Sequence, residues 1–311
     1  MEIKGRKIRC LLAYKSYPMT MALYFRRALE RRNDIELFTV GEFFGQDIPW
    51  DGGMKIPMKY LNQVDLPLPP GMSRPSWKSV SSHLPWSPDL VINVDAGFHF
   101  STKPDVPYAV VATDPHVLGD WYGEVRPIVD KFFNMQPYSK YRQNDDELLP
   151  YAFDPWCHFP ERLEKEYDCS IIGLHYPQRN EWVARLRAKG VKVNYDIGEI
   201  LDEYRQSNNK ARIGLNWSSL EDVTARVFEI MAMRLVPVLN RLQGLDLLGF
   251  EEGRHYLGFS SMDEAVEKVV WAMNNRPQAE QIALEAYQFV SNNNMTYDNR
   301  VDQILHSMGI L

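Results

Sequence analysis

Residues 221–241, EDVTARVFEIMAMRLVPVLNR, combine an amphipathic helix with an apolar strand that follows it directly. The spacing of apolar residues predicts a helix over 223–234 and a buried strand over 235–240. Glu229 lies inside the apolar run, where a charged side chain requires a partner or a ligand. The stretch therefore predicts one helix–strand unit of an α/β protein, with polar groups concentrated at the start of the helix.

The same alternation of strand and helix extends along the whole chain. Continuous apolar runs between helices indicate parallel sheets buried on both faces. The rhythm restarts near 153–167, so we expect two Rossmann-like doubly wound domains with a ligand cleft at the carboxyl edges of their sheets. The predicted strands are 7–14, 35–41, 88–95, 106–114, 131–136, 147–153, 167–174, 191–196, 211–217, 235–240 and 255–259, and the predicted helices are 20–32, 179–190, 200–207, 223–234, 262–275 and, as one or two helices, 278–309, with 45–75 mostly loop.

Composition indicates a soluble globular protein of two domains. The 311 residues are 45% hydrophobic and 24% charged. No apolar run approaches the roughly 20 residues that span a bilayer, and the start does not resemble a signal peptide, so we expect no membrane span and a cytoplasmic protein. Three cysteines, an odd number without metal-ligand spacing, fit a reducing compartment. The oligomeric state is not indicated.

Charge is concentrated at the start of the chain. Residues 1–32 carry nine Lys or Arg and two Glu, although the net charge of the whole chain is −6. Such a segment could meet an anionic partner such as nucleic acid. Alternatively, Arg26, Arg27, Arg31 and Arg32 form a solvated helix face.

The start of the helix in 223–234 has the groups that a nucleotide diphosphate requires. Asn216 ends the preceding strand, so the free helix N–H groups at Thr224 should face the carboxyl edge of the sheet, where they favour a phosphate by about 0.3 to 1 kcal/mol per charge. Arg226 could bond a diphosphate, Glu229 could accept the two hydroxyls of a ribose, and Glu221 could reach a second polyol.

Ordinary structural roles would also explain these residues. Glu221 could simply favour the positive end of the helix dipole, and Thr224 could be a helix cap. Arg226 and Glu229 could form a surface ion pair three residues apart. The burial expected for the helix favours the ligand-binding interpretation.

The spacing Glu221-x7-Glu229, followed by Met-Ala and VPVLN, resembles the donor-sugar motif of GT-B glycosyltransferases of the group 1 type. The pattern R-x-F-E-x-M-A is similar to the subgroup that contains CgeB-like spore-maturation proteins. LPYAFDPWCHF (149–159), SIIGLHYPQRNEWVARL (170–186) and residues 262–305 resemble further segments of that subgroup in the same order.

The resemblance implies a GT-B fold with three parts. These are an acceptor-binding domain over 1–150, a nucleotide-sugar-binding domain over 151–295 and a C-terminal helix over 296–311 that crosses back to the first domain. Two residues, Met233-Arg234, stand where the family usually has glycine.

The family's donor-site roles carry over to six residues of this chain. Glu229 would bind the ribose and Glu221 would face the transferred sugar. The phosphates would be bound by Thr224, Ala225 and Arg226, with Arg179 as a second phosphate-binding arginine; as an alternative, Arg179 is a surface residue at a helix start. Asn216, at the end of the preceding strand, is a further candidate for nucleotide binding from its position alone.

The resemblance further implies transfer with retention of anomeric configuration, in which Arg226 and the helix start stabilise the departing diphosphate. No cofactor and no metal are expected. On the acceptor side, Asp95, Asp114 and His116 end predicted strands and could orient an acceptor hydroxyl, or act as base if the reaction inverts. Alternatively, these strand-end residues only cap the following turns.

The function predicted is therefore transfer of a hexose from a UDP-glucose-like donor to a glycan, a protein or a hydroxymethylated DNA base. Two alternatives stay open: a sugar-nucleotide epimerase or hydrolase of the same fold, and a non-catalytic, spore-coat-like protein that binds carbohydrate or nucleotide. A nicotinamide dehydrogenase is disfavoured because no G-x-G-x-x-G follows the first strand.

Overall fold

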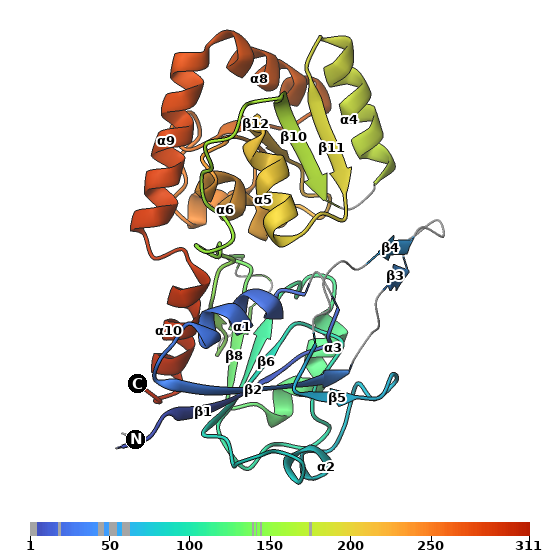
Figure 1. Ribbon diagram of the computed structural model, residues 1–311, viewed down its shortest axis with the longest axis vertical. Coiled ribbons are helices and arrows are strands. Elements are labelled where there is room, and N and C mark those ends of the chain that lie inside the picture. The colour runs from blue at the N-terminus through green and yellow to red at the C-terminus, as the bar shows by residue number, and fades with distance from the viewer. Residues whose placement is uncertain are drawn as a thin grey trace. The chain divides into compact units, whose positions relative to one another are not determined.

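A computed structural model describes residues 5–17, 20–42, 47–49, 55–57, 63–138, 140, 142–143, 145–173 and 176–311, with 47–49 and 55–57 described by their backbone alone. The chain divides into two compact units. The N-terminal unit comprises 1–150 together with 297–311, and the C-terminal unit comprises 151–296. Each unit is built around its own parallel sheet (Figure 1).

The N-terminal unit contains a seven-stranded parallel sheet in the order β5-β2-β1-β6-β7-β8-β9. All residues of the central strands β6 and β7 are buried, as expected for a sheet covered on both faces. The strands are β1 (Ile8–Ala13), β2 (Ile35–Glu42), β5 (Leu66–Leu68), β6 (Leu90–Val94), β7 (Tyr108–Ala112), β8 (Lys131–Asn134) and β9 (Glu147–Leu148), and a separate antiparallel pair joins β3 (Asp47–Pro49) to β4 (Lys55–Pro57).

The last helix of the chain, α10 (Tyr297–Ser307), packs on α1 (Ala22–Glu30) in the N-terminal unit (Figure 1). Tyr297 stacks on Tyr24 with ring centroids 5.1 Å apart. Arg31 forms an ion pair with Asp298 at 2.8 Å, and Arg32 pairs with Asp302 and, at 2.8 Å, with Asp34. The shorter helices of this unit are α2 (Trp77–Ser81), α3 (Gly119–Val125) and the 3-10 turn η1 (Arg126–Ile128).

These ion pairs account for much of the basic run near the start of the chain. Arg26 pairs with Glu30 one helical turn away, at 2.7 Å. Together with the pairs that Arg31 and Arg32 make, internal carboxylates neutralise much of the charge that a nucleic-acid partner would need. The basic segment therefore holds α10 in place, and it gives no support to a DNA acceptor.

The C-terminal unit contains a five-stranded parallel sheet in the order β11-β10-β12-β13-β14. Its core includes two clusters, one that contains Trp182, Leu215, Val238 and Val269 and another that contains Ile230. The elements are β10 (Tyr167–Gly173), α4 (Pro177–Ala188), β11 (Val193–Ile197), α5 (Leu201–Asn209), β12 (Ala211–Asn216), α6 (Ala225–Ala232), β13 (Val236–Asn240), α7 (Gln243–Leu247), β14 (Leu257–Phe259), α8 (Met262–Asn274) and α9 (Arg276–Asn292).

The predicted fold class, two doubly wound parallel-sheet domains, is confirmed. The helix predicted over 223–234 is shorter than expected, because Thr224 is its extended N-cap and Met233 its C-cap. Sequence periodicity missed several short elements, among them β5, α2, α3 and α7, which are three to seven residues long and too short to show a period. Among the described residues, no helix combines the length and hydropathy needed to cross a bilayer.

Candidate functional site

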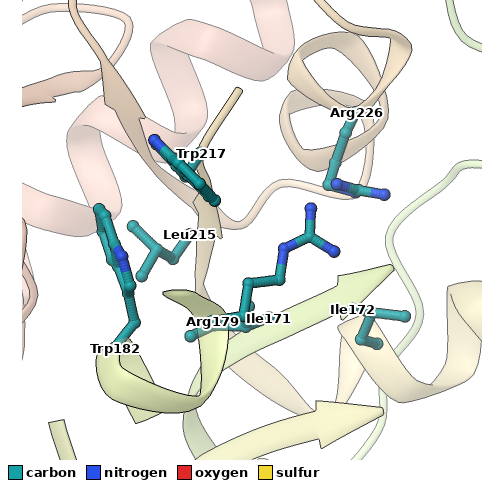
Figure 2. A pocket seen from close by; sticks show the side chains of 7 residues that line it. All are labelled: Ile171, Ile172, Arg179, Trp182, Leu215, Trp217 and Arg226. Atoms are coloured by element: carbon teal, nitrogen blue, oxygen red, sulfur yellow. The ribbon is translucent and has the colours of Figure 1, made fainter. Parts of the chain in front are cut away.

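The candidate site lies at the carboxyl edge of the C-terminal sheet. Strands β10 and β12 end there at Gly173 and Asn216, and helices α4 and α6 begin just beyond them. Arg179 from the first turn of α4 and Arg226 from the first turn of α6 extend their guanidinium groups toward each other beside Trp217 (Figure 2). Two positive charges from different helices therefore share one small pocket.

Gly173 makes this approach possible. A Cβ atom at this position would lie 2.6 Å from Nη2 of Arg226 and 2.8 Å from Nη1 of Arg179. Both distances are shorter than non-bonded atoms allow, so any larger residue would push the guanidinium groups away. The glycine at the end of β10 therefore provides the space in which both arginines lie.

The two arginines are held at a cost that a bound anion would remove. Arg179 is only 7% exposed, and burial, followed by the charge of Arg226, lowers its pKa to about 10. Arg226 donates a hydrogen bond to Oδ1 of Asn216 at 3.3 Å, while its buried Nε has no hydrogen-bond partner in the described part of the chain. The hydroxyl of Tyr195, on β11, is likewise buried and unsatisfied within the described residues.

The N-terminus of α6 has no side-chain cap among the described residues. Thr224 occupies the N-cap position, but its Oγ1 accepts a hydrogen bond from Nδ2 of Asn216 at 3.2 Å instead of capping the helix. No acidic residue lies in the first turn, which begins with Ala225. The first backbone N–H groups and the positive end of the helix dipole are therefore available to an anion.

Glu229 lies one turn further along α6 and is 7% exposed. Its Oε1 is 3.7 Å from Nε2 of His158, a fully buried residue in the segment before β10. Because Nδ1 of His158 accepts the backbone N–H of Asp154 at 3.2 Å, the proton of a neutral imidazole lies on Nε2, toward the carboxylate.

Tyr204 on α5 completes the surroundings of this acid. Burial raises the pKa of its hydroxyl well above the usual range, and the negative charge of Glu229 raises it further, while Arg226 lowers it. Tyr204 and His158 were not found from the sequence. His158 falls within the quoted segment 149–159, but no spacing or periodicity connects either residue to Glu229.

Glu221 lies in the turn between β12 and α6. It is exposed and has φ of 56°, a left-handed conformation that costs a non-glycine residue about 1–2 kcal/mol. A hydrogen bond stabilises the turn: the backbone N–H of Asp222 donates to Oγ of Ser218 at 3.0 Å. The backbone of Glu221 is strained, and the polyol-binding role predicted for this residue stays a prediction.

In the N-terminal unit, Asp95 is the centre of a hydrogen-bonded cluster at the carboxyl ends of β6 and β7. Its carboxylate accepts bonds from the hydroxyl of Tyr17 at 2.6 Å, the hydroxyl of Thr113 at 2.7 Å and the N–H of Ala96 at 2.8 Å. Asp95 is 7% exposed and has φ of 72°. The bond to Ala96 is the turn-capping role that the sequence left open.

Asp114 and His116 lie in the turn that follows β7 and are half-buried. The carbonyl of Asp114 accepts the N–H groups of Val117 at 3.0 Å and Leu118 at 2.9 Å, which fixes the turn. The candidates therefore form two groups. The first group lies at or near the start of α6 and comprises Arg179, Asn216, Thr224, Ala225, Arg226 and Glu229, with Glu221 in the turn before α6. The second group comprises Asp95, Asp114 and His116, which follow two neighbouring strands of the N-terminal unit.

The C-terminal part of the chain matches a known family. Residues 155–306 match the model of a family described as glycosyl transferase-like. No curated protein matches the chain. The narrower likeness to CgeB-like proteins stays a prediction.

Solved structures match almost the whole chain in fold. HepE from Anabaena, in complex with UDP and glucose, matches with a TM-score of 0.65 at 10% identity, covering 98% of this chain and 100% of that one. A glycosyltransferase from Rickettsia africae matches with 0.63 at 8% identity, covering 98% of both chains. A UDP-N-acetylglucosamine 2-epimerase matches with 0.59 at 9% identity, again covering 98% of both. The chain therefore has the GT-B, glycosyltransferase-like fold.

Proposed function

We propose that this protein is a glycosyltransferase that moves a hexose from a UDP-linked donor to an acceptor hydroxyl with retention of anomeric configuration. The bond between the sugar's anomeric carbon and the diphosphate oxygen breaks, and a bond from that carbon to the acceptor oxygen forms on the same face. The proton of the acceptor hydroxyl passes to the departing phosphate oxygen, and UDP leaves. The reaction as written requires no protein base, cofactor or metal.

One observation carries this proposal: Arg179 and Arg226 meet in one pocket beside the uncapped N-terminus of α6. The guanidinium groups of buried Arg179 and half-buried Arg226 repel each other, and this repulsion adds to burial in lowering the pKa of Arg179. A diphosphate would neutralise both guanidinium charges, and its oxygens would accept hydrogen bonds from the backbone N–H groups of Ala225 and Arg226. Because its charge grows as the glycosidic bond breaks, the same groups would stabilise the transition state more than the ground state.

Glu229 would bind the ribose of the same nucleotide. It lies one helical turn beyond the proposed diphosphate site, and the Nε2 of His158 and the hydroxyl of Tyr204 lie beside its carboxylate. The Nε2–H of His158 would fix the carboxylate orientation, so that its oxygens accept two adjacent hydroxyls. Glu221 would contact the transferred sugar from the turn before α6.

The acceptor would bind to the N-terminal unit, at the carboxyl ends of β6 and β7. Asp114 and His116, which are half-buried in the turn after β7, would orient its hydroxyl. Asp95, fully engaged by three donors, would hold the strand ends in place. We propose a glycan or protein acceptor in preference to a modified DNA base, since Arg26, Arg31 and Arg32 of the basic segment pair with carboxylates of this chain.

The test is binding and turnover of UDP-glucose by the parent, by Arg226→Ala and by Glu229→Ala. Arg187→Ala, an exposed arginine at the other end of α4, is the matched control. At 100 times its dissociation constant, UDP should stabilise the parent and the control by about 2.7 kcal/mol, and each site variant by less. Equal shifts in all four proteins would place the nucleotide elsewhere.

Product analysis separates the proposal from its two rivals. A transferase releases UDP at a rate that rises when an acceptor glycan or peptide is added. An epimerase or hydrolase converts the donor without any acceptor, which would refute transfer. A non-catalytic protein binds UDP and converts nothing.

A further inference from the structure

A second pocket lies at the opposite edge of the C-terminal sheet, where its strands begin. We call it the amino-edge pocket. It has a volume of about 370 Å³ and is lined by the starts of β10, β12 and β13, by the junction of α8 with α9, and by the segment before β10. In Figure 1 the junction of α8 and α9 lies at the end of this unit that is remote from the arrowheads of β10 and β11. A nucleotide at the start of α6 therefore cannot fill it.

The floor of the amino-edge pocket is apolar. Ligand pockets for small molecules typically enclose about 300–1,000 Å³ and combine such a floor with a few placed polar groups. The volume here falls in that range, so the pocket has room for a flat or branched hydrocarbon body. The floor consists of Ile213, Met233, Val236, Met273, Ala279 and Ala283.

Five basic side chains surround this floor: Arg162, Lys165, Arg212, Arg234 and Arg276. Within the described ranges, none of the four guanidinium groups takes part in a hydrogen bond or an ion pair. This contrasts with Arg31, Arg205 and Arg241, each of which forms ion pairs with a carboxylate. Four arginines from different segments thus line one cavity without a carboxylate partner: Arg212 is half-buried, and Arg162, Arg234 and Arg276 are exposed to solvent.

The nearby acids do not neutralise these arginines. Glu161 is paired with Arg205 at 3.0 Å, and Asp168 accepts the backbone N–H of Lys192 at 2.9 Å. Glu280, on the exposed side of α9, is the third acid in the lining. Positive groups therefore outnumber negative groups by five to three, and two of the three acids have partners of their own.

Two of these cations occupy unfavourable positions. Arg234 has φ of 57° at the end of α6, a left-handed position where glycine would be unstrained. Lys165 donates to the carbonyls of Asn209 at 2.6 Å and Ala211 at 2.9 Å, and burial, followed by the charge of Arg212, lowers its pKa. A bound anion would relieve the repulsion between these two cations.

We propose that the amino-edge pocket binds a small organic phosphate, with its apolar body on the floor and its phosphate on Arg212, Arg234 and Arg276. A phosphate offers several oxygens to planar guanidinium donors, which suits several arginines better than a single carboxylate does. The site is independent of the proposed transferase activity. Its ligand would be an effector or an anchor bound at the far edge of the sheet from the donor.

The probe for this site is 1-naphthyl phosphate, measured by isothermal titration calorimetry. The affinities of uncharged 1-naphthol and of inorganic phosphate measure separately how tightly the pocket binds the apolar part and the anionic part of the probe. The parent should bind 1-naphthyl phosphate at least tenfold more tightly than either part. The double variant Arg212→Gln, Arg276→Gln should bind it at least tenfold more weakly than the parent, and saturating UDP should leave its affinity unchanged.

Arg187→Gln, which removes an exposed charge outside the pocket, is the matched control and should bind as the parent does. Arg276→Gln alone changes only the exposed first residue of α9, so it folds and gives an intermediate affinity even if the double variant is unstable. The proposal is overturned if the parent does not bind 1-naphthyl phosphate, if the Arg276→Gln affinity equals that of the parent, or if UDP displaces the probe.

Discussion

The polar groups at the strand ends of the two sheets differ in how completely they are hydrogen-bonded. In the N-terminal unit, both oxygens of Asp95 accept hydrogen bonds, from Tyr17, Thr113 and Ala96. In the C-terminal unit, Arg226 makes one long hydrogen bond to Asn216, and its buried Nε has no partner in the part of the chain that the structure describes. One cluster is complete without a ligand, and the other is not.

This difference distinguishes residues that stabilise the fold from residues that we expect to bind a ligand. Removing one partner from a satisfied buried network costs stability, because other groups are left unpaired. Removing a repelled, partly unsatisfied charge costs the fold little, and its loss appears when the ligand is added. Asp95 and Arg226 should therefore respond to mutation in opposite measurements.

The largest effect is expected for Arg226→Ala in catalysis. If Arg226 stabilises the departing diphosphate, kcat should fall by about 10²–10³, the cost of losing one preorganised donor. The free energy of unfolding in urea should stay the same or rise, because Arg179 loses the like charge that helps to lower its pKa.

Arg187→Ala is the control for this comparison, because it removes an arginine from α4 outside the pocket. Its kcat and its urea midpoint should both match those of the parent. A large loss of stability in Arg226→Ala, with kcat lowered only in proportion to the folded fraction, would make Arg226 a structural residue and would remove the contrast with Asp95.

Asp95→Asn should show the reverse pattern. The substitution leaves three donors, from Tyr17, Thr113 and Ala96, facing a group that accepts through only one oxygen. We expect a loss of about 1–3 kcal/mol in unfolding free energy, measured with urea, because hydrogen bonds to a charged group are among the stronger ones. The dissociation constant of UDP should not change. Tyr17→Phe, which removes one donor, should cost less, and an unchanged urea midpoint in Asp95→Asn would contradict the structural role.

A smaller and more selective effect is expected at Glu229. If its carboxylate accepts ribose hydroxyls, the parent should bind UDP about tenfold more tightly than 2′-deoxy-UDP, since one charge-assisted hydrogen bond contributes roughly 1.5–3 kcal/mol at most. Glu229→Gln should abolish this preference, as measured by calorimetry with both ligands. If the variant still preferred UDP over 2′-deoxy-UDP, a group other than Glu229 would have to bind the ribose 2′-hydroxyl.

The sequence predicted the fold class and the start of α6 because both depend on local pattern. Continuous apolar runs such as Leu90–Val94 indicate buried parallel strands, and Asn216, Thr224 and Arg226 lie close together in the chain. The helix periodicity of 223–234 also placed Glu229 in a buried run, where the structure has it.

Contacts between distant segments could not be predicted in this way. His158 reaches Glu229 from 71 positions earlier in the chain, and Tyr204 does so from another helix. The basic run around the end of α1 was also ambiguous, because Asp298 and Asp302, which pair with Arg31 and Arg32, lie on α10, more than 260 positions away. Local charge counts cannot reveal such partners, since only the tertiary fold brings them together.

The smallest effect is expected at Glu199, which follows β11 at the carboxyl edge of the C-terminal sheet. Like Arg226, it is a charged residue whose hydrogen bonds are incomplete, but it is an acid. One of its oxygens accepts from the hydroxyl of Ser207 at 2.7 Å, while the other is buried without a partner among the described residues. Burial, with Asp196 adding to it, raises the pKa of Glu199 to about 7.

Because this folded-state pKa lies above the unfolded value of 4.5, the protonated acid contributes stability that is fully present below about pH 4.5 and is lost as the pH rises through about 7. Glu199→Gln stays neutral and should be more stable than the parent at pH 8, with the difference shrinking toward pH 5. Partial exposure keeps the gain below about 1 kcal/mol. Urea unfolding at both pH values checks this, with the exposed Glu267→Gln on α8 as control; a gain that is equal at pH 5 and pH 8 would show that titration of Glu199 is not its cause.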